Sequence, residues 1–99
     1  GRTWVGDLGF YVDGEPVESG ITFKSNGFGQ DEQWFYDWDQ RAAILDVRWW
    51  IDHGALYLDY GNRYPLLVLE AIYVDGRYLT GRLYSNNIDQ GTVTLVMAD

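Results

Sequence analysis

The residues of this chain best suited to chemistry are its aromatic and acidic side chains. Trp34, Tyr36 and Trp38 alternate within the run WFYDW, so an extended chain would point all three toward one face. Tryptophan rings supply contact area and tyrosine hydroxyls supply hydrogen bonds, a combination that holds apolar or carbohydrate ligands. The run therefore predicts either a ligand pocket or an interior filled by aromatic rings, and both interpretations stay open.

The acidic residues and the single histidine give weaker signals. Carboxylates cluster at Asp31-Glu32 and at Asp37 and Asp39, but this spacing is too short for a calcium loop and favours a solvated segment. His53, the sole histidine, precedes a glycine in turn-like sequence and cannot form a multi-histidine metal site. The chain has no cysteine and no serine in a G-x-S-x-G context. We therefore expect no catalytic residues, metal or cofactor, and we disfavour a glycosidase with paired carboxylates.

Length and charge narrow the class of protein further. The chain has 99 residues, 46% of them apolar, which is enough for one domain spanning residues 1–99 with a modest core. Fifteen acidic residues against seven basic ones give a net charge of −8, which repels nucleic acid. The apolar run PLLVLEAIYV is interrupted by Glu70 and is shorter than the roughly 20 residues that cross a membrane. We expect no nucleic-acid partner and no membrane span.

Short strands separated by turns are the pattern of the whole chain. Twelve glycines punctuate segments rich in β-branched and aromatic residues, which is typical of an all-β protein. Short connections between consecutive strands predict an antiparallel up-and-down meander, and eight strands can close into a small barrel without exposed edges. A two-sheet β-sandwich is the alternative. The eight strands are expected near residues 3–12, 17–25, 28–38, 43–52, 55–61, 66–74, 77–85 and 91–98.

The stretch LDVRWWIDHGALYLDY predicts the register of one hairpin. If His53-Gly54 forms a two-residue turn, Trp50 faces Tyr57 and Arg48 faces Asp59. The two faces then separate cleanly, because Trp50 and Tyr57 fall on the outer one. The inner face, expected to be buried, comprises Val47, Trp49, Ile51, Leu56, Leu58 and Tyr60.

Glu70 has an uncertain direction in a second predicted hairpin. A turn at Asp75-Gly76 would place Glu70 opposite Gly81, on the same inner face as Ile72. A carboxylate at such a position is costly unless it is paired. It is either a polar anchor in the lumen, or a shift of register turns it to solvent.

Several segments together resemble the small lipocalin-like domains of secreted bacterial proteins. They are TWVGDLG, ITFKSNGFGQ, W-x-I-D-H-G-x-L-x-L-x-Y and DGRYLTGRLY, which cover most of the chain. The resemblance implies an eight-stranded barrel, and export to the periplasm, the cell surface or the extracellular space. It implies no particular chemistry.

Two functional expectations follow, and neither is an enzyme. The first is a non-catalytic domain that binds a small apolar or carbohydrate ligand. The second is a structural or protein-interaction module, including a homodimer, whose exposed patch is formed by Trp50 and Tyr57. The residues expected to contact a ligand are Trp34, Tyr36, Trp38, Trp49, Tyr60 and Glu70.

Overall fold

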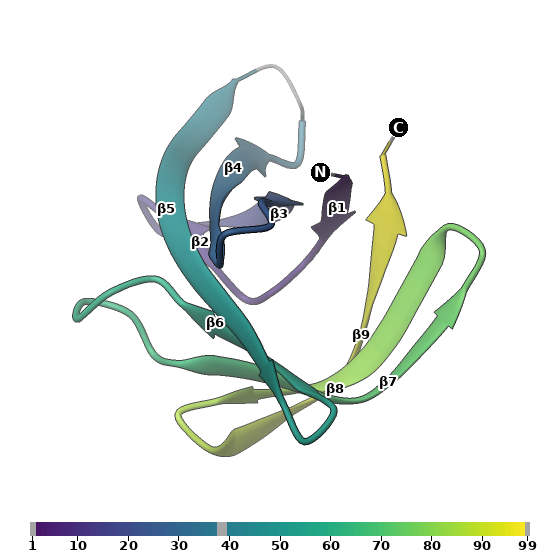
Figure 1. Ribbon diagram of the computed structural model, residues 1–99. Helices are drawn as coiled ribbons and strands as arrows, with labels where there is room; N and C mark the ends of the chain where they lie inside the picture. The colour runs from purple at the N-terminus through teal and green to yellow at the C-terminus, as the bar shows by residue number, and fades with distance from the viewer. Residues whose placement is uncertain (1, 38–39, 99) are drawn as a thin grey trace.

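The chain forms an antiparallel β-barrel in a computed structural model that describes residues 2–37 and 40–98 (Figure 1). Strands β3 to β8 each pair with the next strand in sequence, and β1 pairs with both β9 and β3, which closes the barrel. The expected eight-stranded up-and-down barrel is confirmed, with one short additional strand, β2. Within the described ranges, no helix is long and apolar enough to span a membrane. The strands are β1 (Thr3–Gly6), β2 (Tyr11–Val12), β3 (Glu15–Phe23), β4 (Phe28–Phe35), β5 (Arg41–Asp52), β6 (Ala55–Asp59), β7 (Leu67–Asp75), β8 (Tyr78–Ser85) and β9 (Ile88–Met97).

The first strand is interrupted, contrary to the expectation of one strand over residues 3–12. Gly6 pairs with Ser19 and Tyr11 pairs with Pro16, so residues 7–10 oppose two residues of β3. The surplus chain leaves the ladder and runs between β1 and β2 (Figure 1). We call residues 7–10 the strap. Its Leu8 side chain is only 3% exposed and belongs to the core.

The hairpin of β5 and β6 has the register that the sequence predicts. Trp50 pairs with Tyr57 and Arg48 with Asp59. His53 and Gly54 both have positive φ angles, 52° and 79°, as a type I′ turn requires. The Trp50 and Tyr57 rings stack on the outer face with centroids 5.3 Å apart and planes 6° from parallel.

The prediction that Ile51 is buried with the rest of the inner face is wrong. Leu56 and Leu58 are buried, whereas Ile51 is 66% exposed. The pairing of β4 with β5 ends at Arg48, so the tip of the hairpin extends beyond the neighbouring strand. Ile51 pairs with Leu56 as predicted, but at the hairpin tip it has no neighbouring strand whose side chains could bury it.

The interior of the barrel is filled mainly by aliphatic side chains. Trp49 is half-buried against this core, and its ring packs edge-on against Phe23 with centroids 5.5 Å apart. The Trp49 indole N–H also donates to the carbonyls of Lys24 and Phe28, both at 3.0 Å. Trp49 thereby fastens the β3–β4 turn to β5. The buried members of the core are Leu8, Ile21, Val47, Leu56, Leu58, Tyr60, Leu67, Leu69, Leu83 and Leu95.

The hairpin of β7 and β8 differs from its predicted register. Asp75 pairs with Tyr78, so the turn comprises Gly76 and Arg77 rather than Asp75 and Gly76. Gly76, with φ 60°, takes the first turn position, where a type II′ turn places glycine. A bulge lies earlier in β7, between Glu70 and Tyr73.

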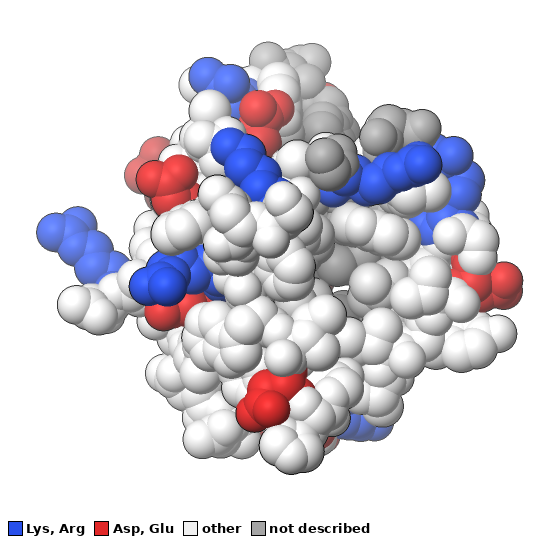
Figure 2. All heavy atoms as spheres, in the orientation of Figure 1, with Lys and Arg blue, Asp and Glu red and all other residues white. Residues whose placement is uncertain are grey.

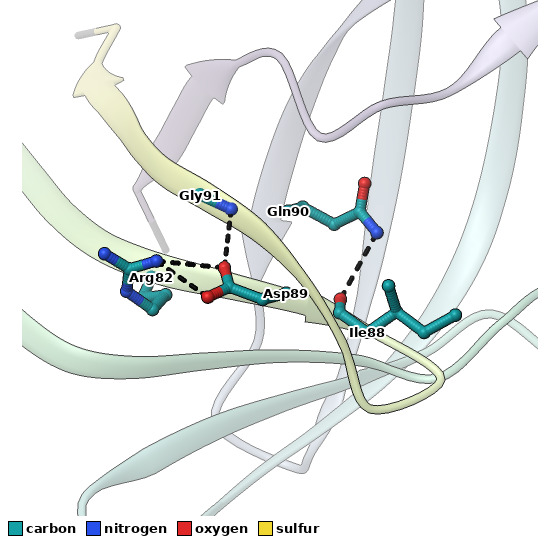
Figure 3. Close-up of polar contacts among 5 residues, drawn as sticks. All are labelled: Arg82, Ile88, Asp89, Gln90 and Gly91. Atoms are coloured by element: carbon teal, nitrogen blue, oxygen red, sulfur yellow. Dashed lines mark hydrogen bonds and ion pairs between the residues drawn. The ribbon is translucent and has the colours of Figure 1, made fainter.

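A second irregularity lies at the start of β9. Tyr84 pairs with Asp89 but Leu83 pairs with Gly91, which leaves Gln90 as the extra residue. The Asp89 carboxylate accepts two hydrogen bonds from Arg82 at 3.0 and 2.8 Å, and one from the Gly91 N–H at 2.8 Å (Figure 3). Gln90 lies on the other side of β9 from this ion pair and donates to the Ile88 carbonyl (Figure 3).

Trp49 provides a test of the packing. We expect Trp49→Ala to lower the free energy of unfolding by about 3 kcal/mol, at the lower end of the range for core tryptophans because the ring is half-exposed. Trp49→Phe should cost about 1–2 kcal/mol, since it keeps an aromatic ring but loses the indole hydrogen bonds. Ile51→Ala is the matched control and should change stability by less than about 0.5 kcal/mol. Urea denaturation measures all three, and equal losses for Trp49→Ala and Ile51→Ala would contradict this account.

Candidate functional site

A polar cluster lies inside the barrel, near the strap. Ser19 and Asp31 are completely buried, and Gln33 is 1% exposed. Ser19 pairs with Gly6, the last residue before the strap, and with Gln33 on the next strand. These three are the buried polar residues of the described chain. This part of the interior is therefore polar, whereas the rest of the core is mainly aliphatic.

The Asp31 carboxylate is the centre of this cluster. Its Oδ2 atom accepts hydrogen bonds from the Tyr60 hydroxyl at 2.8 Å and from the Gln33 amide at 3.2 Å. Its Oδ1 atom accepts from the Gly20 N–H at 3.2 Å. All three partners donate, which is the arrangement that an ionised carboxylate requires.

The Ser19 hydroxyl retains capacity for a further hydrogen bond. Its Oγ atom is buried and forms no well-aligned hydrogen bond within the described part of the chain. It nevertheless lies close enough to Asp31 to help lower the pKa of that carboxyl. A buried polar atom without a well-formed hydrogen bond is uncommon in native proteins, and the interaction that Ser19 does make is with the Asp31 carboxylate.

No positive charge compensates Asp31. All seven Lys and Arg side chains and His53 are exposed. Figure 2 shows the described Lys and Arg side chains at the surface of the face in view. Burial raises the pKa of Asp31 above its ordinary value of 3.8, although the hydrogen bonds oppose this shift. Burial and the Asp31 charge together raise the pKa of Tyr60 well above 10.

Aromatic rings cover the cluster. The Phe10 ring, carried by the strap, lies 4.8 Å from the Tyr60 ring and 5.9 Å from the Tyr64 ring, measured between centroids. Tyr60 and Tyr64 are themselves 6.1 Å apart. Tyr60 therefore contacts both the buried carboxylate and the aromatic cover.

Two hollows flank the strap, and both are lined by Leu8 and Gly9. The larger, of about 390 Å³, lies between the strap and strands β8 and β9. The smaller, of about 200 Å³, is bounded by Phe10, Tyr64 and Leu67. The Leu8 side chain thus borders both hollows.

A third hollow lies on the outer side of Tyr60. This cleft of about 410 Å³ crosses β4, β5 and the end of β6. Basic Lys24 and Arg48 line it together with acidic Asp46 and Asp59. The Arg48 guanidinium lies 5.3 Å from the centre of the Phe28 ring. The charges in this cleft balance one another, unlike that of Asp31.

Trp34 and Tyr36 do not point into the barrel, so the predicted inward direction is wrong for these two residues. Trp34 lies on the outer face, where its indole donates to Glu32 at 2.8 Å. Tyr36 is 45% exposed, and burial together with the charge of Asp7 raises its pKa to about 12. Trp38 lies outside the described residues. β4 ends at Phe35, and a register shift between Gln33 and Trp34 interrupts the pairing with β5 before Tyr36.

The other predicted ligand residues are dispersed. Trp49 contacts the β3–β4 turn, and Tyr60 is buried against Asp31. Glu70 is exposed and pairs with Arg82 on the outer face, so the interpretation of Glu70 as a lumen anchor is wrong and the shift of register is confirmed. The positive φ of Ala71, 52°, marks the bulge that follows Glu70. Of the five that the structure describes, Tyr60 alone hydrogen-bonds to the polar cluster.

The prediction that Asp31 lies in a solvated segment is wrong, because its side chain is completely buried, and sequence reasoning did not single out Gln33 or Ser19. The run GQDEQ is polar throughout and therefore resembles a solvated segment. A signal was nevertheless present, since Ser19 alternates with the apolar Val17 and Ile21 on one face of β3. Pairing β3 with β4 across the intervening turn places Asp31 opposite Ile21, which directs it inward.

The outer face carries a second surface of aromatic character. Trp50, Tyr57, Val68 and Tyr84 are consecutive cross-strand neighbours on β5 to β8. Val68 is 7% exposed although it faces outward. A groove of about 290 Å³ runs over it, lined by Tyr57, Leu66, Val68, Glu70, Tyr84 and Asn87.

The chain matches no known protein-family model, and no curated protein or solved structure resembles it significantly. Among the described residues, no group of three or more His, Cys, Asp or Glu side chains is placed to hold a metal ion. The site is therefore defined by its own geometry, as a buried hydrogen-bonded carboxylate beneath an aromatic cover.

The raised pKa of Asp31 makes stability depend on pH. Between its unfolded-state and native-state pKa values, the native protein binds more protons, so stability falls as pH rises through that window. We expect the free energy of unfolding of the wild type, minus that of Asp31→Asn, to decrease with pH across the window and then level off. Urea denaturation at intervals between about pH 3 and 7 measures this difference. A difference that grows with pH would show that the hydrogen bonds outweigh burial.

Proposed function

We propose that this domain is a non-catalytic binding module that takes a small ligand at the end of the barrel closed by the strap. The observation that carries the proposal is the hydrogen-bonded Asp31 carboxylate beneath the strap. A barrel that needed only a stable core would place an aliphatic side chain there, because burial of a carboxylate costs free energy. A polar group retained inside an apolar barrel instead orients a ligand.

The strap is the part of the cover best able to move. Residues 7–10 lie outside the strand ladder, and the Val17 N–H donates to the Phe10 carbonyl at 3.1 Å. The Gly9 N–H bonds within the strap, to the Asp7 carboxylate at 2.8 Å. Segments with few ladder hydrogen bonds open at a lower free energy than the strands around them. Displacement of Leu8 would join the flanking hollows and admit a ligand to the cluster.

The wider expectations form part of the same proposal. The closed eight-stranded antiparallel barrel supports a lipocalin-like relationship. Location in the periplasm, at the cell surface or outside the cell remains a prediction that accompanies it. Ser19 and Asp31 are both completely buried, and the sole histidine, His53, is exposed at a hairpin turn, which favours binding over catalysis.

A second candidate is a protein-interaction module that uses the outer aromatic surface. Trp50 is 41% exposed and stacks on Tyr57, and the groove over Val68 begins beside this pair. Tryptophan and tyrosine are enriched at the centres of interfaces. This candidate includes the expected homodimer.

Removal of the Leu8 side chain tests the first proposal. The neutral apolar dye N-phenyl-1-naphthylamine becomes fluorescent in apolar sites and serves as the probe. We expect Leu8→Ala to tighten dye binding several-fold, because it opens the space between the two hollows while leaving the strands paired. Fluorescence titration measures the dissociation constant.

Ile51→Ala is the matched control for this test. Ile51 is an exposed apolar residue at the tip of the β5–β6 hairpin, so its removal should leave dye binding unchanged. Dye affinity that depends on Ile51 and not on Leu8 would contradict the proposed site. Absence of binding in both the wild type and Leu8→Ala would contradict the proposed function itself.

Trp50→Ser separates the two candidates. Loss of the stacked pair should lower the free energy of unfolding by about 1 kcal/mol. If the strap end is the functional site, dye affinity and the sedimentation mass stay the same as in the wild type. A wild-type dimer that becomes a folded monomer on this substitution would favour the interaction module instead.

A further inference from the structure

We infer that the ligand is a small organic cation, an ammonium group on an apolar body, and that Asp31 is its counter-ion. This inference rests on the proposed function and adds the chemical class of the ligand. Three observations carry it: an uncompensated buried charge, unused hydrogen-bonding capacity beside that charge, and an aromatic, apolar cover.

The charge of Asp31 is the first observation. Its partners, the Tyr60 hydroxyl, the Gln33 amide and the Gly20 N–H, are all neutral donors. Every Lys, Arg and His of the chain is exposed, so the protein supplies no cation to this carboxylate. Buried charges are usually paired, because the attraction of the partner offsets the cost of desolvation. A cationic ligand would complete the pair, whereas an anionic one would be repelled.

The second observation is the remaining hydrogen-bonding capacity. An ionised carboxylate offers about four acceptor positions, and the protein occupies three of those on Asp31. The single bond to Oδ1 leaves that oxygen open to another donor. The Ser19 hydroxyl, which is buried and directs its hydrogen only weakly toward Asp31, keeps its lone pairs free and offers a second acceptor beside that carboxylate. An ammonium group carries three donors and would satisfy both atoms.

The cover is the third observation. Phe10, Tyr60 and Tyr64 form a cluster with ring centroids 4.8–6.1 Å apart. Aromatic faces attract cations as well as apolar groups, and the attraction strengthens where water is excluded. Leu8 and Leu67 line the hollow of about 200 Å³ next to these rings, which suits a small apolar body.

A metal ion fits these residues less well than an organic cation. Calcium takes six to eight oxygen ligands and magnesium keeps a near-octahedral shell, whereas the cluster offers one carboxylate. Among the described residues no group of three or more acidic or metal-binding side chains gathers there. The net charge of −8 draws small cations of either kind toward the protein. The cover then selects the one that carries an apolar body.

The test compares three probes of one shape and different charge. They are 2-phenylethylammonium, the neutral 2-phenylethanol and the anionic 3-phenylpropionate, each titrated calorimetrically into the full chain and into Leu8→Ala. We expect the ammonium to bind at least tenfold more tightly than the alcohol, and the anion to bind most weakly. In Asp31→Asn the preference for the ammonium over the alcohol should fall to about twofold or less.

Asp46→Asn is the matched control, because it removes an exposed carboxylate and changes the net charge equally. It should leave the preference intact. Should Asp31→Asn fail to fold, the Asp31 ¹³Cγ resonance of the wild type replaces it, and should shift with the ammonium but not with the alcohol. A preference that survives in Asp31→Asn, or an unmoved resonance, overturns the inference. If the ammonium and the alcohol bind equally well, and both bind more tightly to Leu8→Ala, the inference is overturned but the proposed function stands. If neither the dye nor any of the three probes binds, both are overturned.

Discussion

Closure of the barrel by the short strand β1 is the constraint on which the rest of the structure depends. Its residues pair on one side with β3 and, through Trp4 and Val5, with β9 on the other. At Gly6 the backbone comes so close to β9 that a Cβ atom would lie 2.5 Å from Leu95 Cδ2 and 2.7 Å from the Thr94 carbonyl. Glycine at this position permits the approach. The chain then leaves the ladder as the strap, so the same strand that closes the wall also begins the cover over its end.

A closed eight-stranded barrel has an interior narrow enough for side chains to fill. Aliphatic residues such as Leu58 and Leu69 fill most of it and supply the stability that comes from apolar burial. The polar cluster around Asp31 occupies part of the interior that aliphatic side chains would otherwise fill, so this part contributes less apolar burial. A carboxylate held by neutral donors gains less than it would beside a cation, so the fold tolerates this cluster because the rest of the core compensates.

Tyr60 connects the interior to the surface. Its hydroxyl donates to Asp31 while its ring contacts Phe10 and borders the charged cleft on β4 and β5. Any displacement of the aromatic cover therefore acts on the carboxylate through one side chain. The Trp50–Tyr57 pair, by contrast, lies on the opposite face of its hairpin and has no such connection. The two candidate functions are accordingly separable by mutation.

The sequence by itself determined the all-β class, the meander and the full register of the β5–β6 hairpin. A two-residue turn at His53-Gly54 fixes every pair in that hairpin, including Trp50 with Tyr57, because local turn geometry sets register. The tertiary structure decided which way Trp34, Glu70 and Asp31 point. Bulges shift the register beside Trp34 and Glu70, and the inward direction of Asp31 depends on pairing with β3. The bulges and the strap are required by the curvature and closure of the barrel. Both arise only when distant strands pair, so the local alternation of apolar and polar residues does not predict them.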